Sequence, residues 1–179
     1  QKNFTEIGKS EYSGLTPNLD QFAQTYNFVE NYYNAVTPTI NALISSQCGI
    51  IPDLDNIRIK DNMDYNAKLF CLSDFLHKVG YYQVYMQGAS IDFSGKNQLF
   101  ETHRFDQVLG FEQIAEQNSL SHTKTHYWGL QDPDLITETL IVLESLQAKK
   151  PYHLSFLTLN THPPGFTSPE CPIFHTNNT

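Results

Sequence analysis

The order of helix-like and strand-like segments constrains this chain more than any other feature of its sequence. Apolar residues recur at helical spacing after Thr16-Pro17, again from Thr39, and again after Asp132-Pro133. Residues 81–86 and 152–159 are instead rich in the aromatic and β-branched residues that favour strands. Because strands separated by helices are joined by crossover connections, this order predicts an α/β fold with a mostly parallel sheet flanked by helices.

Other segments predict additional elements of the same fold. We expect a short strand at 28–33 and a helix that is capped by Asn66 and ends at Gly80. Segments 49–65 and 88–96 carry residues that disfavour regular structure and are expected to be loops. Residues 81–86 lack clean alternation, which is typical of a strand buried on both faces.

Size and charge exclude several classes of protein. The chain has 179 residues and a formal net charge of -8, and no basic stripe that would fit a nucleic acid. Its densest basic run, Lys149-Lys150, fits the solvated end of a helix. No run approaches the roughly 18 apolar residues of a membrane span, so a soluble domain without a nucleic-acid partner is expected.

The three cysteines do not reveal their state by themselves. Cys48, Cys71 and Cys171 are odd in number and have no Cys-X-X-Cys spacing, which argues against zinc held by a thiolate cluster. They fit a reduced protein, and they fit an exported protein with one bridge and one remaining thiol.

Candidate catalytic groups follow the predicted strands, where active groups of parallel sheets lie. Thr37 or Thr39 at a helix start suits attack on a phosphate or sulfate ester, although position alone favours a capping role. His162 can act as an acid, or can simply bond to the backbone, and Lys96 can pair with an anionic group or lie solvated at the surface. The segments concerned are 34–39, 87–96 and 160–165.

Other conspicuous residues are interpreted more simply. His122 and His126 are expected at the surface rather than in a metal site, and Trp128 is expected to be a packing anchor. The chain has no GxGxxG, GxxxxGKS/T, GxSxG or HExxH motif, which removes common nucleotide-binding, hydrolase and zinc-protease classes.

Several short motifs, taken in order, resemble the phosphoglycerol transferase I branch of the sulfatase-like alkaline phosphatase superfamily. The relatives of that branch include lipoteichoic acid synthases and phosphoethanolamine transferases. The resemblance runs from about residue 15 to 172. Its motifs are TPNLD at 16–20, TI at 39–40, SSQCGI at 45–50, CLSDFL at 71–76, MQGA at 86–89, FSGK at 93–96, WGLQD at 128–132 and LTLNTH at 157–162.

This resemblance implies a fold and an activity. It implies that residues 1–179 form the N-terminal part of one sulfatase-like catalytic domain, and thus an incomplete domain. The implied enzyme is a metal-dependent transferase, with manganese as the divalent metal, that moves phosphoglycerol from phosphatidylglycerol to a periplasmic glucan through a phospho-threonine. The implied location is the periplasmic face of the bacterial inner membrane, with membrane segments outside this chain.

The resemblance also assigns roles to single residues. Thr39 takes the roles of nucleophile and metal ligand, His162 lies near the transferred group, and Lys96 binds the headgroup. Relatives carry an aromatic residue where Ser94 stands. A glutamate ligand falls before the first residue and an Asp-His pair after the last, so the 179 residues alone are expected to be inactive.

An exported enzyme implies an oxidising compartment and therefore a disulfide. On this basis Cys48 and Cys71 are expected to be bridged, with Cys171 left to pair downstream. A free-thiol titration tests this pairing.

Two other functions stay open. One is a sulfatase or phosphodiesterase of the same superfamily that uses water as acceptor, although Thr39 is not the Cys or Ser that becomes formylglycine. The other is a non-catalytic domain that binds glucan or lipid.

Overall fold

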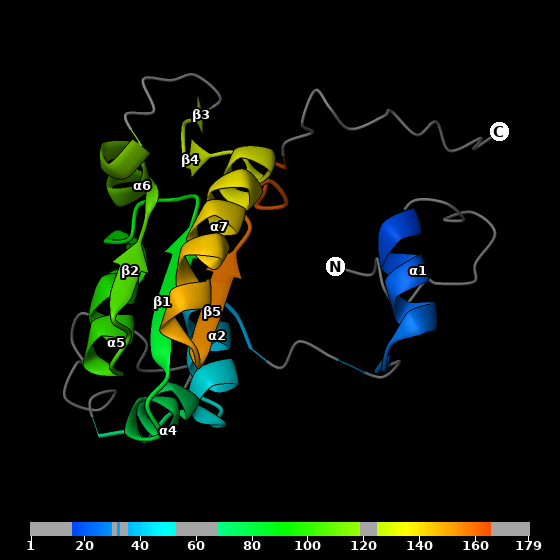
Figure 1. Cartoon of the computed structure of the whole chain (residues 1–179). Helices are drawn as coiled ribbons and strands as arrows, with labels where there is room; N and C mark the ends of the chain where they lie inside the picture. The colour runs from blue at the N-terminus through cyan, green and yellow to red at the C-terminus, as the bar shows by residue number, and fades with distance from the viewer. Residues whose placement is uncertain (1–15, 30–31, 33–35, 53–67, 119–124, 166–179) are drawn as a thin grey trace, which may run out of the picture. The chain divides into compact units, whose positions relative to one another are not determined.

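The computed structural model describes residues 16–29, 32, 36–52, 68–118 and 125–165 (Figure 1). These residues belong to two compact units, and each is described by itself. The unit of residues 1–35 and 169–179 contains helix α1 (Pro17–Thr25), which begins at the Thr16-Pro17 signal, as predicted. The unit of residues 36–168 contains the sheet.

A three-stranded parallel sheet forms the centre of the larger unit, which confirms the predicted α/β class. Its order is β2 (Gln107–Leu109), β1 (Tyr82–Gln87) and β5 (Tyr152–Leu157), and β1 is parallel to both neighbours. Strands β3 (Thr125–His126) and β4 (Gly129–Leu130) form a separate antiparallel pair. As expected, β1 is buried on both faces.

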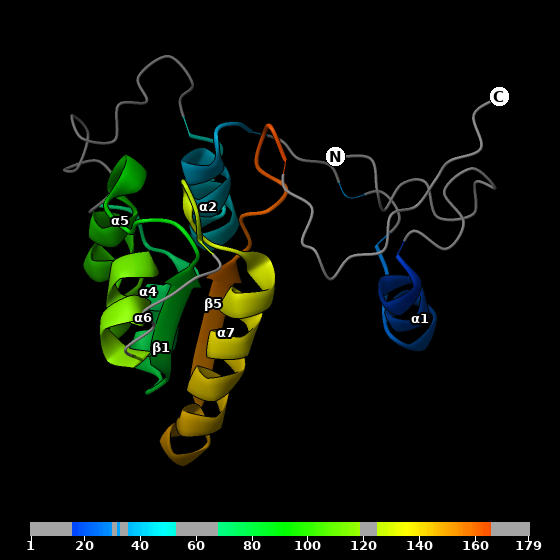
Figure 2. The ribbon, with the colours of Figure 1, turned by 90° about the horizontal axis from the view of Figure 1, so that it is seen from above.

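Helices cover both faces of this sheet. Viewed from above, α6 and α7 lie on one side of β1 and β5, and α2 and α5 lie on the other (Figure 2). The helices of this unit are α2 (Thr39–Cys48), α4 (Leu72–Lys78), α5 (Lys96–Thr102), α6 (Phe111–Asn118) and α7 (Asp132–Leu146), with short 3-10 turns η3 (Phe93–Gly95) and η4 (Gln147–Lys149).

The alternation of side chains along β1 divides the core in two. Val84 and Met86 pack with Ile114 of α6 and Leu135 of α7. Tyr85, which points to the opposite face, belongs to a second cluster. That cluster contains Ile91, Phe100 and Phe105, with Leu43 of α2 packed against it. Burial of two apolar layers against one strand fixes the helices on the sheet.

Several predicted boundaries are wrong. The strand expected at 152–159 ends at Leu157. The helix expected from Asn66 begins at Leu72, because the Asp74 carboxylate accepts the Cys71 backbone N–H at 2.8 Å and caps the helix there, whereas Asn66 itself lies outside the described residues. The loop expected at 88–96 contains the turn η3 and the first residue of α5.

The strand expected at 28–33 is absent at residues 28, 29 and 32, which are the described residues of that segment. Aromatic composition favours a strand only when a neighbouring strand pairs with it. No helix among the described ranges is long and apolar enough to cross a membrane.

Candidate functional site

Thr39 is the first residue of α2 and is exposed to solvent. The residue that caps the helix is Pro38, which has no side-chain donor or acceptor. Neither the Thr37 nor the Thr39 hydroxyl forms a hydrogen bond with another described residue. The capping role favoured by position alone is therefore wrong, and the Thr39 hydroxyl stands at the positive end of a ten-residue helix.

Packing holds this helix from its first turn onward. Ile40 and Ile44 are buried in one cluster with Leu99 of α5. At its last residue, Cys48 is joined to Cys71 by a disulfide, which confirms the predicted pairing. Helix α2, which begins at Thr39, is thus fixed both along its apolar face and at its C-terminal end.

Lys96 is buried, with only 4% of its surface exposed, so a solvated surface position is ruled out. It follows Ser94 and Gly95, whose φ angles are +62° and +67°. Its Nζ donates to the Phe93 carbonyl at 3.3 Å and lies 5.0 Å from the centroid of the Phe93 ring. Burial lowers the pKa of Lys96 to about 8. The side chain therefore remains a cation at neutral pH although it is buried.

His162 lies in an exposed turn after β5. Its backbone N–H donates to the Leu159 carbonyl at 2.9 Å, and its Nδ1 is 2.9 Å from the Pro163 carbonyl oxygen. Because a carbonyl only accepts, Nδ1 carries the hydrogen. A neutral ring then presents Nε2 as an acceptor, and Nε2 donates a proton only from the charged form.

Two aromatic rings connect Lys96 with His162. The Phe93 ring is 5.8 Å from the Trp128 ring in an edge-to-face arrangement, and the Trp128 ring is 5.2 Å from His162. Trp128 therefore packs between His162 and Phe93, the residue that Lys96 contacts. The sequence offered no signal for this contact, because the three segments are far apart along the chain.

Two glycines bring the Trp128 loop to this position. The Leu130 N–H donates to the Gly88 carbonyl at 2.8 Å, directly after β1. Gly129 has a φ of +138°, and a Cβ on it would overlap the Gly88 carbonyl oxygen. Only glycine permits this approach of two backbones.

The His162 turn is held by two further residues that the sequence analysis missed. The Asp132 carboxylate accepts the backbone N–H groups of Leu159 and Asn160 at 2.5 and 3.1 Å. In the sequence, Asp132-Pro133 indicated the start of a helix and Asn160 indicated a turn. Nothing in the sequence indicated that these two residues contact each other.

The structure thus connects Lys96 and His162 through a series of aromatic contacts. Among the described contacts, none joins Thr39 to either residue. In the described part of the chain, the group of three side chains that lie close enough together to hold a metal ion is Cys48, Cys71 and His103, and it does not include Thr39. Thr39 offers a single hydroxyl oxygen. The described residues around it do not by themselves fit a divalent metal, which takes several ligands.

Comparison with known proteins identifies the family of the chain. The family described as Sulfatase matches residues 4–176. The chain is 30% identical over 170 residues to phosphoglycerol transferase I of Escherichia coli O127:H6, an alignment that covers 93% of this chain and 21% of the relative. Phosphoglycerol transferase I of Escherichia coli 55989 is 30% identical over 137 residues, which are 18% of its length. The chain therefore spans about a fifth of the length of these curated relatives.

Solved structures identify the fold. A protein in the alkaline phosphatase superfamily from Vibrio parahaemolyticus matches 98% of this chain and 42% of its own, with a TM-score of 0.77 and 22% identity. The lipoteichoic acid synthase LtaP from Listeria monocytogenes matches 92% of this chain and 39% of its own, with a TM-score of 0.75 and 15% identity. The chain belongs to the Sulfatase family and has the fold of the alkaline phosphatase superfamily.

Proposed function

We propose that this chain is part of a phosphoglycerol transferase that takes the headgroup of phosphatidylglycerol and passes it to a glucan hydroxyl. The observation that carries this proposal is the 30% identity with phosphoglycerol transferase I over 93% of the chain. The enzyme would work at the periplasmic face of a bacterial inner membrane and be attached to it through segments outside these residues.

Thr39 is the proposed nucleophile. Its hydroxyl loses its proton and its oxygen forms a bond to the phosphorus of the lipid, while the bond from phosphorus to the diacylglycerol oxygen breaks and that oxygen takes up a proton. A glucan hydroxyl then loses its proton and attacks the same phosphorus, the bond from phosphorus to the Thr39 oxygen breaks, and the Thr39 oxygen takes up a proton. The hydroxyl of Thr39 is exposed at the N-terminus of α2 and forms no capping hydrogen bond. This position supports the assignment, because the helix dipole favours a phosphate there.

Lys96 and His162 are the proposed substrate-binding and acid groups. The Lys96 ammonium, buried against the Phe93 ring, supplies a positive charge for an anionic headgroup. His162 would hold a phosphoryl oxygen or protonate the leaving oxygen through Nε2. The Trp128 ring between Phe93 and His162 supports a common site for these two residues.

A divalent metal, with manganese as our choice, would be bound partly by the Thr39 oxygen. The other ligands proposed from the family resemblance, a glutamate and an Asp-His pair, lie outside residues 1–179. When bound, the metal would neutralise negative charge at the reacting phosphate.

The experiment uses the longer natural protein with phosphatidylglycerol and Mn²⁺, and measures intact mass together with diacylglycerol release. We expect a phosphoglycerol adduct that is lost in Thr39→Ala and retained in Thr37→Ala, a matched control two residues away. Diacylglycerol release that persists in Thr39→Ala would contradict the nucleophile assignment.

The same reaction separates the other functions. A transferase attaches phosphoglycerol to added glucan, whereas a hydrolase of the same superfamily releases glycerol phosphate at the same rate with and without glucan. A non-catalytic glucan- or lipid-binding domain produces neither diacylglycerol nor an adduct, and that result would overturn the proposal.

A further inference from the structure

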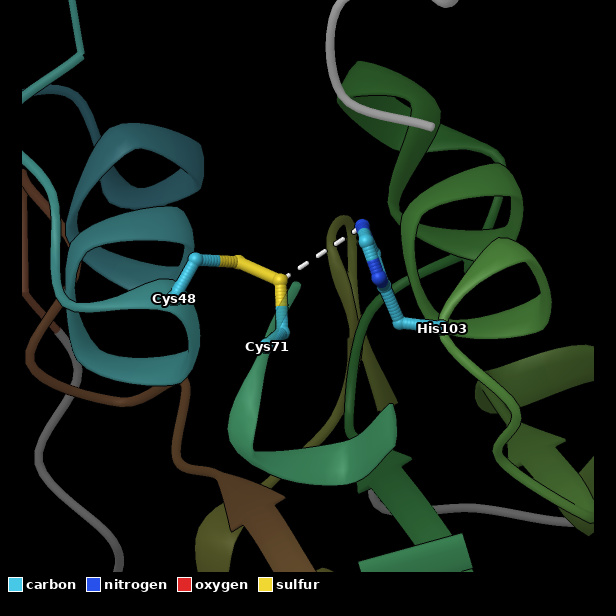
Figure 3. Close-up of side chains that lie close together, drawn as sticks. All are labelled: Cys48, Cys71 and His103. Carbon is cyan, nitrogen blue, oxygen red and sulfur yellow. Dashed lines mark hydrogen bonds between the residues drawn. A yellow bond between two sulfur atoms is a disulfide. The ribbon is translucent and has the colours of Figure 1, made fainter. Parts of the chain in front are cut away.

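A histidine lies beside the disulfide on the side of the sheet that carries α2 and α5. Figure 3 shows a ring nitrogen of His103 facing the sulfur of Cys71, with Cys48 on the other side of that sulfur. The His103 Nε2 is 3.6 Å from the Cys71 Sγ. One ligand atom from each of these three residues lies within 4.8 Å of the other two. Cys71 and His103 are buried, at 2% and 3% exposure, and Cys48 is half-buried.

Asp74 fixes the tautomer of this histidine. The Asp74 Oδ2 is 2.8 Å from the His103 Nδ1, and a carboxylate there accepts the Nδ1 hydrogen. The lone pair of Nε2 is then left facing the sulfur. A histidine whose second nitrogen bonds to a carboxylate is the usual arrangement of metal-binding histidines, because the carboxylate orients the ring and makes it more basic.

Contacts other than the sulfur–sulfur bond hold the three residues near one another. Cys48 ends α2, which packs through Ile40 and Ile44 on Leu99 of α5. His103 directly follows α5, and its backbone N–H donates to the Leu99 carbonyl at 3.2 Å.

Asp74 connects the remaining residue to the same group. Its carboxylate accepts the Cys71 backbone N–H at 2.8 Å while it also contacts His103. Breaking the disulfide therefore leaves α2, α4 and α5 joined by apolar packing and by the Asp74 carboxylate.

We propose that, once the disulfide is reduced, Cys48, Cys71 and His103 bind one zinc ion, with water as the fourth ligand. A dithiol gives two electrons and two protons to the disulfide and becomes a disulfide itself, which leaves two Cys thiols. Zinc then replaces the two thiol protons, which are released to solvent, and takes the Nε2 lone pair of His103.

The geometry and the chemistry of the donors both favour zinc. Zn–S bonds of about 2.3 Å in a tetrahedral site place the two sulfurs about 3.8 Å apart. The three ligand atoms already lie within 4.8 Å of one another, so a small rotation of the freed Cys side chains would be enough. Thiolate and imidazole ligands select zinc over the hard cations magnesium and calcium, which need oxygen. The absence of Cys-X-X-Cys spacing argued against a thiolate zinc site, because the three ligands are far apart in the sequence, at positions 48, 71 and 103.

The test uses the 179-residue chain with Cys171→Ser, reduced with dithiothreitol that is then removed under nitrogen. Titration with Co²⁺, a spectroscopic substitute for zinc, should give a sulfur-to-cobalt charge-transfer band that saturates at one ion per chain. Zn²⁺ should abolish the band, and the oxidised chain should show none. Absence of the band in the reduced, folded chain would overturn the proposal.

Variants distinguish a metal site that includes His103 from metal binding by the two Cys thiols alone. His103→Ala should weaken Co²⁺ binding at least about tenfold, and added imidazole should restore it, whereas His77→Ala on the exposed side of α4 should change nothing. Asp74→Asn should weaken binding about tenfold through the histidine. His103→Gln serves if the alanine variant fails to fold by circular dichroism. A folded His103 variant that binds as the parent does would contradict the assignment.

Discussion

Asp132 and Asn160 hydrogen bond to each other in both directions. The Asn160 side-chain oxygen accepts the Asp132 backbone N–H at 3.1 Å, and the Asp132 carboxylate accepts the Asn160 backbone N–H at 3.1 Å. The same carboxylate accepts the Leu159 N–H at 2.5 Å. The first residue of α7 is thus joined to the turn after β5 that carries His162.

Removal of the Asp132 carboxylate should loosen this turn. In Asp132→Ala, two backbone N–H groups lose a charged acceptor, and we expect the free energy of unfolding to fall by about 2–3 kcal/mol. Urea denaturation measures this loss, and hydrogen exchange should accelerate at the Leu159 and Asn160 amides. Asp134→Ala removes another acidic residue from the same helical turn and should have a smaller effect. Equal losses in the two variants would assign the effect to the helix dipole instead.

A methyl group at Gly129 should separate the Trp128 loop from β1. Gly129→Ala places a Cβ against the Gly88 carbonyl oxygen in addition to the strain of a positive φ. Gly80→Ala is the matched control, since φ is +86° there and nothing lies within 4 Å of the added Cβ. We expect Gly80→Ala to lower the free energy of unfolding by about 1–2 kcal/mol and Gly129→Ala to lower it further. If Gly80→Ala is as destabilising as Gly129→Ala, the predicted cost of the overlap with the Gly88 carbonyl oxygen is wrong.

Lys96 should titrate well below other lysines. Burial lowers its pKa to about 8, so its charge is present at pH 7 and is lost as the pH rises through 8. NMR of the 13C-labelled lysine Cε carbons should show one resonance titrating near 8 that is missing from Lys96→Met. Because the unfolded chain keeps this proton to higher pH, stability should rise between pH 8 and 10 relative to Lys96→Met. A stability difference that stays flat over this range would contradict the burial of a charged lysine.

The disulfide should contribute about 3 kcal/mol to stability. Cys48 and Cys71 are separated by 23 positions, and closing a loop of this length restricts the unfolded chain by about that amount. Urea denaturation in metal-free buffer, with and without a dithiol, measures the difference. The Cys48→Ser/Cys71→Ser double variant should be insensitive to the dithiol, and sensitivity there would point to another cysteine.

The sequence allowed the parallel sheet and its principal helices to be predicted. Helices α1, α2 and α7 begin where the Thr16-Pro17, Thr39 and Asp132-Pro133 signals predict, because starts of helices depend on local residues. Strands β1 and β5 were predicted because their segments are rich in the aromatic and β-branched residues that favour strands. Strands β2, β3 and β4 were not predicted, since each spans only two or three residues. Helices α5 and α6 were not predicted either.

The candidate site, like the fold, was predicted only in part from the sequence. The sequence alone nominated Thr39, Lys96 and His162, and the roles of these residues stay predictions. Only the tertiary structure decided that Lys96 is buried and that Trp128 lies between Phe93 and His162. It also decided that His103 approaches Cys71. Helix starts and strand composition are encoded by neighbouring residues, whereas burial, ring contacts and hydrogen bonds depend on segments that only the folded chain brings together.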